Sequence, residues 1–334
     1  MTSQTFRKLA RLTALLAFAV VVLGAYVRLT DAGLGCPDWP GCYGKLTVTE
    51  VMRDVSSAEA AFPERAVDAG KAWREMIHRY LAAILGLAIV ALAVIAWRRR
   101  HIPGQPVALP IALVGLVIFQ GLLGMWTVTL LLKPVVVMAH LLGGMTTLAL
   151  LWWLSLSPPT ADSGRHRLAS LALAGVAVVI VQIALGGWTS TNYAALACPA
   201  FPSCNGNWWP EMDFAEGFRL WRGLGVDYEG GVLHNSARMA IHYSHRIFAL
   251  AVIIVLGGLI ARGLRDRTRQ DIRAAARLLA AALTTQLVVG IAIVKTGLPR
   301  SLATAHDAFA AVLLLCLLTM LRRLLPRAVQ SSRQ

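Results

Sequence analysis

Eight long apolar runs, separated by short charged stretches, limit what this chain can fold into. Each run approaches the about 20 residues that an α-helix needs to cross the hydrocarbon layer of a membrane. Only 15% of the 334 residues are charged, against about 25% in a typical soluble domain. We therefore predict an all-α integral membrane protein with eight transmembrane helices, at roughly residues 9–29, 77–97, 107–130, 134–157, 168–190, 240–261, 275–295 and 301–321.

The basic residues predict which side of the membrane each connection faces. One side carries 18 basic residues (Lys and Arg) against 3 acidic ones (Asp and Glu), whereas the other side carries 14 basic and 14 acidic residues. Because basic loops stay in the cytoplasm, we predict that both termini are cytoplasmic and that the two long connections are periplasmic. The net charge of +15 lies in short segments between apolar runs, which indicates membrane topology and argues against a nucleic-acid partner.

The sequence repeats itself once, which divides the eight spans into two units of four. An even number of spans per unit gives both copies the same orientation, so a pseudo-twofold axis along the membrane normal should relate two tandem four-helix bundles. We predict an N-terminal half at residues 1–160 and a C-terminal half at residues 161–334. The recurring residues, shifted by 162 to 167 positions, are Cys36 with Cys198, Cys42 with Cys204, His78 with His245, Gln120 with Gln286, and His140 with His306.

Four of the five cysteines lie in the long outer connections, in two closely spaced pairs. Outside the cytoplasm such pairs usually oxidise, so we predict the disulfides Cys36–Cys42 and Cys198–Cys204. The fifth cysteine, Cys316, falls inside the last span, where we interpret it as a small apolar packing residue.

Four histidines at matched repeat positions form the candidate site: His78, His140, His245 and His306. Ionisable residues at membrane depth are costly, so each is a functional hypothesis by default. All four lie near the outer ends of even-numbered spans and should share one depth. Two imidazoles per half, on neighbouring helices, suit a haem iron with the porphyrin held in the bundle core.

Two other interpretations of the histidines stay open. Each imidazole could make an interhelical hydrogen bond and nothing more, although four matched positions disfavour that explanation. Zinc fits less well, because no set of three or four ligands converges within one half.

The two halves differ beside the first histidine of each. Glu75 lies one helical turn before His78, and the C-terminal half has His242 at the matching position. We interpret Glu75 as a carboxylate that handles protons during catalysis; the alternative is an interfacial charge paired with a nearby arginine. Arg79 and Arg246, which directly follow the histidines, suit haem propionates, or they extend to the outer surface.

These residues together make the chain resemble the haem A synthase family over nearly its whole length. The resemblance implies a bacterial enzyme of the cytoplasmic (inner) membrane, which oxidises a methyl group of haem O to a formyl group and so makes haem A for terminal oxidases. The motifs that carry it are Gly35-Cys36-Pro37-Asp38-Trp39-Pro40-Gly41-Cys42, Glu75-x-x-His78-Arg79, His140-Leu141-Leu142-Gly143-Gly144, Cys198 with Cys204, and His245-Arg246 with His306.

The resemblance also implies a role for each half. The N-terminal half would bind the haem O substrate through His78 and His140, with Glu75 needed for the chemistry. The C-terminal half would hold a haem b cofactor through His245 and His306. The partners to consider are haem O, the lipid membrane, haem O synthase, a membrane electron acceptor and a second copy of the chain.

Three competing functions are compatible with parts of the pattern. A di-haem b-type cytochrome, which passes electrons between quinone and a partner without modifying haem, fits the histidines equally well. A thiol–disulfide carrier would use the outer cysteines but leaves the histidines unexplained. A transporter is supported by the repeat alone, and the polar residues collect near the outer surface instead of the midplane.

Overall fold

The computed structural model describes residues 3–157 and 166–326, and these residues form eleven helices and no strand. Three of the helices are short and lie in the long connections: α2 (Val48–Arg53), α3 (Val55–Ala61) and α8 (Phe214–Gly217). The predicted cytoplasmic residues Arg165, Arg327 and Arg333 lie outside the described residues, as does the predicted boundary between the halves at residue 160.

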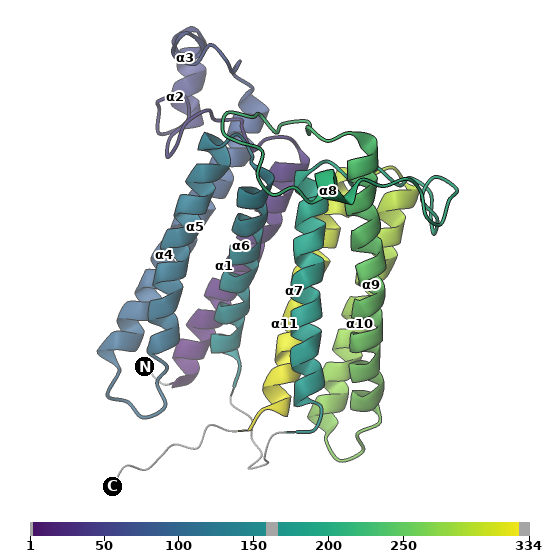
Figure 1. Ribbon diagram of the computed structural model, residues 1–334. Helices are drawn as coiled ribbons and strands as arrows, with labels where there is room; N and C mark the ends of the chain where they lie inside the picture. The colour runs from purple at the N-terminus through teal and green to yellow at the C-terminus, as the bar shows by residue number, and fades with distance from the viewer. Residues whose placement is uncertain (1–2, 158–165, 327–334) are drawn as a thin grey trace.

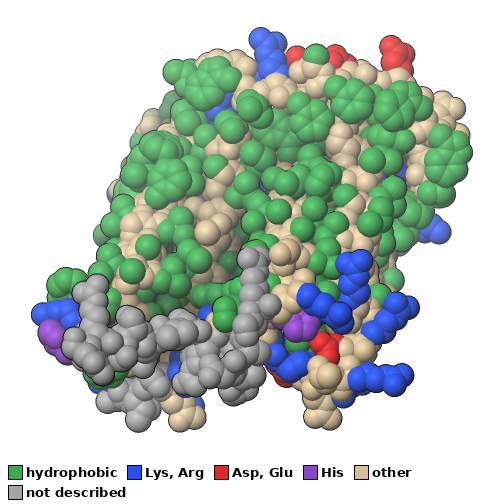
Figure 2. Space-filling model, turned by 60° about the horizontal axis from the view of Figure 1, so that its bottom comes forward, with side chains coloured by type: hydrophobic (Ala, Val, Ile, Leu, Met, Phe, Trp, Pro, Cys, Tyr) green, Lys and Arg blue, Asp and Glu red, His purple; other side chains and the backbone are tan. Residues whose placement is uncertain are grey.

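The other eight helices are each long and apolar enough to cross a membrane, which confirms the eight predicted spans. Figure 2 shows their apolar surface, with Lys and Arg side chains gathered at the end of the bundle away from the long connections. The eight helices are α1 (Ser3–Leu29), α4 (Ala69–Arg98), α5 (Ala108–Thr129), α6 (Pro134–Ser155), α7 (Ala169–Thr191), α9 (Asn235–Leu264), α10 (Gln270–Lys295) and α11 (Arg300–Leu324).

Two of these helices begin earlier than their apolar runs. Helix α4 starts at Ala69 instead of residue 77, and α9 starts at Asn235 instead of residue 240. The Asp68 side chain caps α4 by accepting a hydrogen bond from the Lys71 N–H. The added turns carry polar side chains, so hydropathy does not register them. His78 consequently lies in the third turn of α4, and the prediction that it begins the helix was wrong.

The long helices pack as two groups of four (Figure 1). In the first group α1 and α5 each pack against both α4 and α6, and in the second α7 and α10 each pack against both α9 and α11. The groups meet where α1 and α6 contact α11 and where α6 contacts α7. One apolar core, with Leu148, Leu151, Leu256 and Leu317 fully buried, runs through both groups. This grouping is consistent with a duplicated four-helix unit.

Residues that are repeat partners contact one another at the loop end, as we name the end of the bundle that carries α2, α3 and α8. The Arg28 guanidinium donates to the Ser190 carbonyl at 2.8 Å, and these residues are 162 positions apart. Tyr193 donates its hydroxyl hydrogen to the Asp31 carboxylate at 3.1 Å, across the same separation. Repeat partners meet only beside the axis that relates them, so these contacts support the predicted pseudo-twofold arrangement.

Both predicted disulfides are present in the loop-end connections. Cys36–Cys42 and Cys198–Cys204 have Cα–Cα distances of 4.7 and 4.6 Å, and all four cysteines are fully buried. Cys316 is a free, half-buried thiol that packs against the apolar core, in agreement with its predicted packing role.

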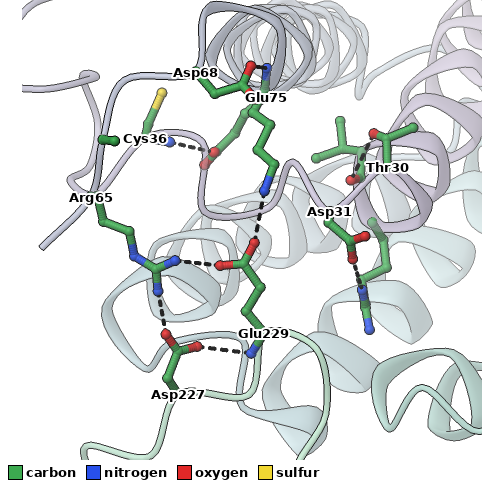
Figure 3. Close-up of polar contacts among 12 residues, drawn as sticks. Thr30, Asp31, Cys36, Arg65, Asp68, Glu75, Asp227 and Glu229 are labelled. Carbon is green, nitrogen blue, oxygen red and sulfur yellow. Dashed lines mark hydrogen bonds and ion pairs between the residues drawn. The ribbon is translucent and has the colours of Figure 1, made fainter.

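A segment of the C-terminal half, residues 219–231, lies over the loop end of the N-terminal half; we call it the strap. Tyr228 is buried beside Leu132, and its N–H donates to the Leu131 carbonyl at 3.1 Å. Glu229 forms ion pairs with Arg65 and with Lys71, as Figure 3 shows for its pair with Arg65. The second long connection therefore covers the first bundle as well as its own.

Candidate functional site

The four predicted histidines lie at the loop end in two facing pairs. His78 on α4 faces His140 on α6, with ring centroids 6.5 Å apart and ring planes at 82°. Two imidazoles that bind one metal ion from opposite sides, through bonds of about 2 Å, would place their centroids roughly 6.5 Å apart. His245 on α9 and His306 on α11 are their repeat counterparts.

The histidines of a pair come from diagonal helices. Helices α4 and α6 both pack against α1 and α5, and α9 and α11 both pack against α7 and α10. The prediction of neighbouring helices was therefore wrong. A diagonal pair faces across the bundle core.

Each imidazole packs against a glycine of a flanking helix. The four glycines are themselves repeat partners, separated by 162 and 166 positions. A Cβ at Gly24, Gly186 or Gly290 would crowd the imidazole, whereas one at Gly124 would make an ordinary contact. The sequence repeat contained this signal, but it does not show which glycine contacts which ring. The pairs, with the distance from an ideal glycine Cβ to the imidazole Cε1, are Gly24–His78 (2.9 Å), Gly124–His140 (3.5 Å), Gly186–His245 (3.1 Å) and Gly290–His306 (2.9 Å).

The ring nitrogens fit a metal-binding role. The Nδ1 atoms of His78, His140 and His306 are buried without a hydrogen-bond partner among the described residues, although buried polar atoms are nearly always paired. No cluster of three or more His, Cys, Asp and Glu side chains occurs in the described ranges. Two imidazoles per half with free coordinating capacity suit a haem iron better than a zinc ion.

Hydrogen bonding to the rings differs between the halves. In the C-terminal half the Gln182 side-chain nitrogen lies 3.2 Å from His245 Nδ1, and that of Gln286 lies 3.2 Å from His306 Nε2. The N-terminal counterpart of Gln182 is Val20. Both C-terminal rings therefore have a side-chain amide beside them. Sequence reasoning missed Gln182, since it has no polar counterpart in the other half.

Glu75 is buried, with 4% of its surface exposed, and points at the first disulfide loop. It accepts hydrogen bonds from the Cys36 N–H at 2.9 Å, as Figure 3 shows, and from the Arg79 guanidinium. The predicted alternative of pairing with a nearby arginine therefore describes a real contact, but the carboxylate is buried and not interfacial.

His242 occupies the matching place in the C-terminal half. Its Nδ1 lies 3.3 Å from the Cys198 nitrogen and its Nε2 lies 3.1 Å from Arg246 Nε, and a neutral imidazole can accept only one of these two hydrogen bonds. Glu75 and His242 thus have equivalent partners, as their sequence positions predicted. At this one place the N-terminal half has an acidic group where the C-terminal half has an imidazole.

Arg79 and Arg246 anchor the disulfide loops. Arg79 donates to the carbonyl oxygens of Asp38 at 3.0 Å and Pro40 at 3.2 Å, and also to that of Gly41. Arg246 donates to the carbonyls of Ala200, Ser203 and Cys198. Their predicted haem-binding role stays a prediction, and the contacts give these arginines a different task.

Comparison with known proteins agrees with this geometry. Residues 7–318 match the COX15-CtaA family, described as cytochrome oxidase assembly protein. A protein of Shewanella oneidensis named Heme A synthase is 44% identical over 317 residues, which cover 93% of this chain and 94% of that protein. Proteins of the same name from Caulobacter vibrioides (29% identical, 91% of each chain) and Halalkalibacterium halodurans (26% identical, 93% and 94%) are also similar.

Proposed function

The chain belongs to the COX15-CtaA family of cytochrome oxidase assembly proteins and makes haem A by oxidising haem O, and we propose that its two halves divide this work. The N-terminal half binds haem O between His78 and His140. The C-terminal half holds haem b between His245 and His306. The observation that carries this proposal is the two histidine pairs, each lodged against glycines at the same end of its bundle.

Glu75 makes the N-terminal half the better candidate for the chemistry. Conversion of a methyl group to a formyl group removes four electrons and adds one oxygen atom, so protons must leave the site. A buried carboxylate one turn from His78 can accept a proton and release it toward the disulfide loop. The C-terminal half has His242 there and so lacks a carboxylate at this place.

The C-terminal half is the better candidate for a permanently bound cofactor. Haem b supplies one-electron transfer when it is bound. His245 and His306 would hold it, and the amides of Gln182 and Gln286 keep both rings oriented. Electrons would then pass to a membrane acceptor, and haem O would come from a haem O synthase in the same membrane.

The proposal includes an orientation in the membrane. Both termini lie in the cytoplasm and both disulfide loops lie in the periplasm, as the excess of basic residues at one end favours. The bacterial relatives are consistent with the inner membrane. Oxidised cysteine pairs at the loop end are expected on that side.

The test is haem extraction from cells that make haem O, with and without this chain. Haem A should appear only with the chain, and a His78→Ala, His140→Ala double variant should not make it. If the purified protein holds haem but cells accumulate no haem A, the chain is an electron-transferring di-haem cytochrome.

A further inference from the structure

Two arginines near the loop ends of α4 and α9 have no side-chain partner among the described residues. Arg74 on α4 and Arg238 on α9 each have a buried Nε atom without a hydrogen-bond partner. Neither forms an ion pair with any residue in the described part of the chain. A guanidinium has five N–H donors, and leaving a buried polar group unpaired is costly. Both side chains therefore have donors free for an acceptor that does not belong to the protein.

Both arginines lie on the histidine face of their helix, toward the loop end. Arg74 precedes His78 by four residues and Arg238 precedes His245 by seven, which are one and two helical turns. With a rise of 1.5 Å per residue, their Cα atoms lie about 6 Å and about 10 Å beyond the histidines. Helical side chains lean toward the helix N-terminus, which is the loop end for α4 and α9.

Four other cations at the loop end already have partners. Arg79 and Arg246 are bonded to the disulfide loops. Lys71 pairs with Glu229 of the strap, and Lys133 donates to the Gly223 carbonyl of the same segment. Among these cations of the two sites, Arg74 and Arg238 are the ones with free donors.

We propose that Arg74 and Arg238 bind the propionate carboxylates of the porphyrins, Arg74 for haem O and Arg238 for haem b. This inference rests on the proposed function and deepens it. A porphyrin held between the facing histidines would turn its carboxylate edge toward the loop end, where each arginine offers a planar fork that matches a carboxylate. The apolar edge would then face the membrane interior.

The test compares two probes, iron protoporphyrin IX and its dimethyl ester, which lacks the carboxylate charges. The full chain, made in haem-deficient cells and purified in detergent, is titrated with each probe and followed by absorbance. Wild type should prefer the free acid by about tenfold to a hundredfold, since a hydrogen bond to a charged group is worth that much. In Arg238→Met the ratio of the affinity for the free acid to that for the ester should fall close to one, while the ester should bind as tightly as it does to wild type.

Two further variants sharpen the comparison. Arg238→Lys keeps the charge but not the fork, so its preference should lie between those of wild type and Arg238→Met. Arg219→Met, at an exposed loop arginine, should behave as wild type. An Arg238→Met protein that keeps the full preference would overturn the inference while leaving haem b binding intact. A wild-type chain that binds neither probe would overturn the proposed function as well.

Arg74 is tested in the same way with haem O. Arg74→Met should weaken haem O binding by about tenfold or more, yet leave the absorption spectrum and reduction potential of the C-terminal haem unchanged. Arg238→Met should instead lower that reduction potential, because a nearby cation favours the reduced haem. Identical effects of the two variants on both haems would contradict the separate assignments.

Discussion

Single positions account for the difference between the two halves. Glu75 and His242 have equivalent partners, yet only the carboxylate can gain a proton from its charged state and become neutral. Val20 and Gln182 also differ, because only Gln182 has a side chain that can hydrogen-bond the nearby imidazole. Duplication preserved the framework, and these substitutions gave the halves unequal chemistry.

Replacing Glu75 should separate catalysis from cofactor binding. Glu75→Gln keeps the shape and the contact with Cys36 but cannot take up a proton, so haem A formation should fall at least about a hundredfold, the usual contribution of a positioned acid–base group. The haem b spectrum should be unchanged. Haem A yield per bound haem measures this, and persistent turnover would make Glu75 a structural residue.

The glycine beside His306 should not tolerate an added methyl group. Gly290→Ala would place a Cβ 2.9 Å from His306 Cε1, so the ring must shift and bound haem b per protein should fall severalfold. Gly258→Ala is the matched control, because its Cβ would have nothing within 4 Å. Haem absorbance of the purified variants checks this. Full haem content in Gly290→Ala would show that haem binding does not depend on the position of the His306 ring against Gly290.

At the scale of whole elements, the strap joins the two halves at the loop end. Arg65, which belongs to the first long connection, pairs with both Asp227 and Glu229 of the strap (Figure 3). The side chains of Arg65 and Glu229 are about three-quarters buried, with 24% and 23% of their surfaces exposed. Sequence patterns predict neither partner, since the pairing depends on where two long connections fold.

A double-mutant cycle on Arg65→Gln and Glu229→Gln measures how strongly the strap is held. We expect a coupling free energy of about 1 kcal/mol, the upper end for partly exposed pairs, and it should decrease with salt. The exposed pair Arg219–Glu216, at 3.7 Å, is the control and should show almost none. Denaturation in detergent gives the values; zero coupling at low salt would mean that other contacts hold the strap.

The turn between α9 and α10 should make stability depend on pH. Hydrogen bonds from Thr268, foremost from its hydroxyl group, and from His166 lower the pKa of Asp266 to about 2. The unfolded value is about 3.9, so the stabilisation is complete above that pH and is lost as the pH falls through about 2. The melting-temperature difference between wild type and Asp266→Asn should shrink over that window; a constant difference would contradict this assignment.

For the molecule as a whole, the sequence was informative about everything that depends on periodicity and spacing. Apolar length predicted eight spans, the close spacing of the outer cysteines predicted both disulfides, and the shift of 167 predicted the equivalence of Glu75 with His242. Such properties are local or are carried by the repeat itself.

What the sequence left open depends on how helices rotate and pack. The diagonal placement of His78 and His140, the loop contacts of Arg79 and the unpaired state of Arg238 all follow from distant segments meeting in space. Residue spacing defines a face of one helix, but it does not define which helix that face meets.

The central claim is that each half binds an iron porphyrin between two facing imidazoles. Its most direct test is the low-temperature electron paramagnetic resonance spectrum of the purified ferric protein, compared among four single His→Ala variants. Without haem O, the account predicts one low-spin bis-histidine haem signal that disappears in the His245 and His306 variants and survives in the His78 and His140 variants. With haem O added, it predicts a second such signal that disappears in the His78 and His140 variants. A colourless wild-type protein, or a signal that persists without His245 or His306, would contradict it.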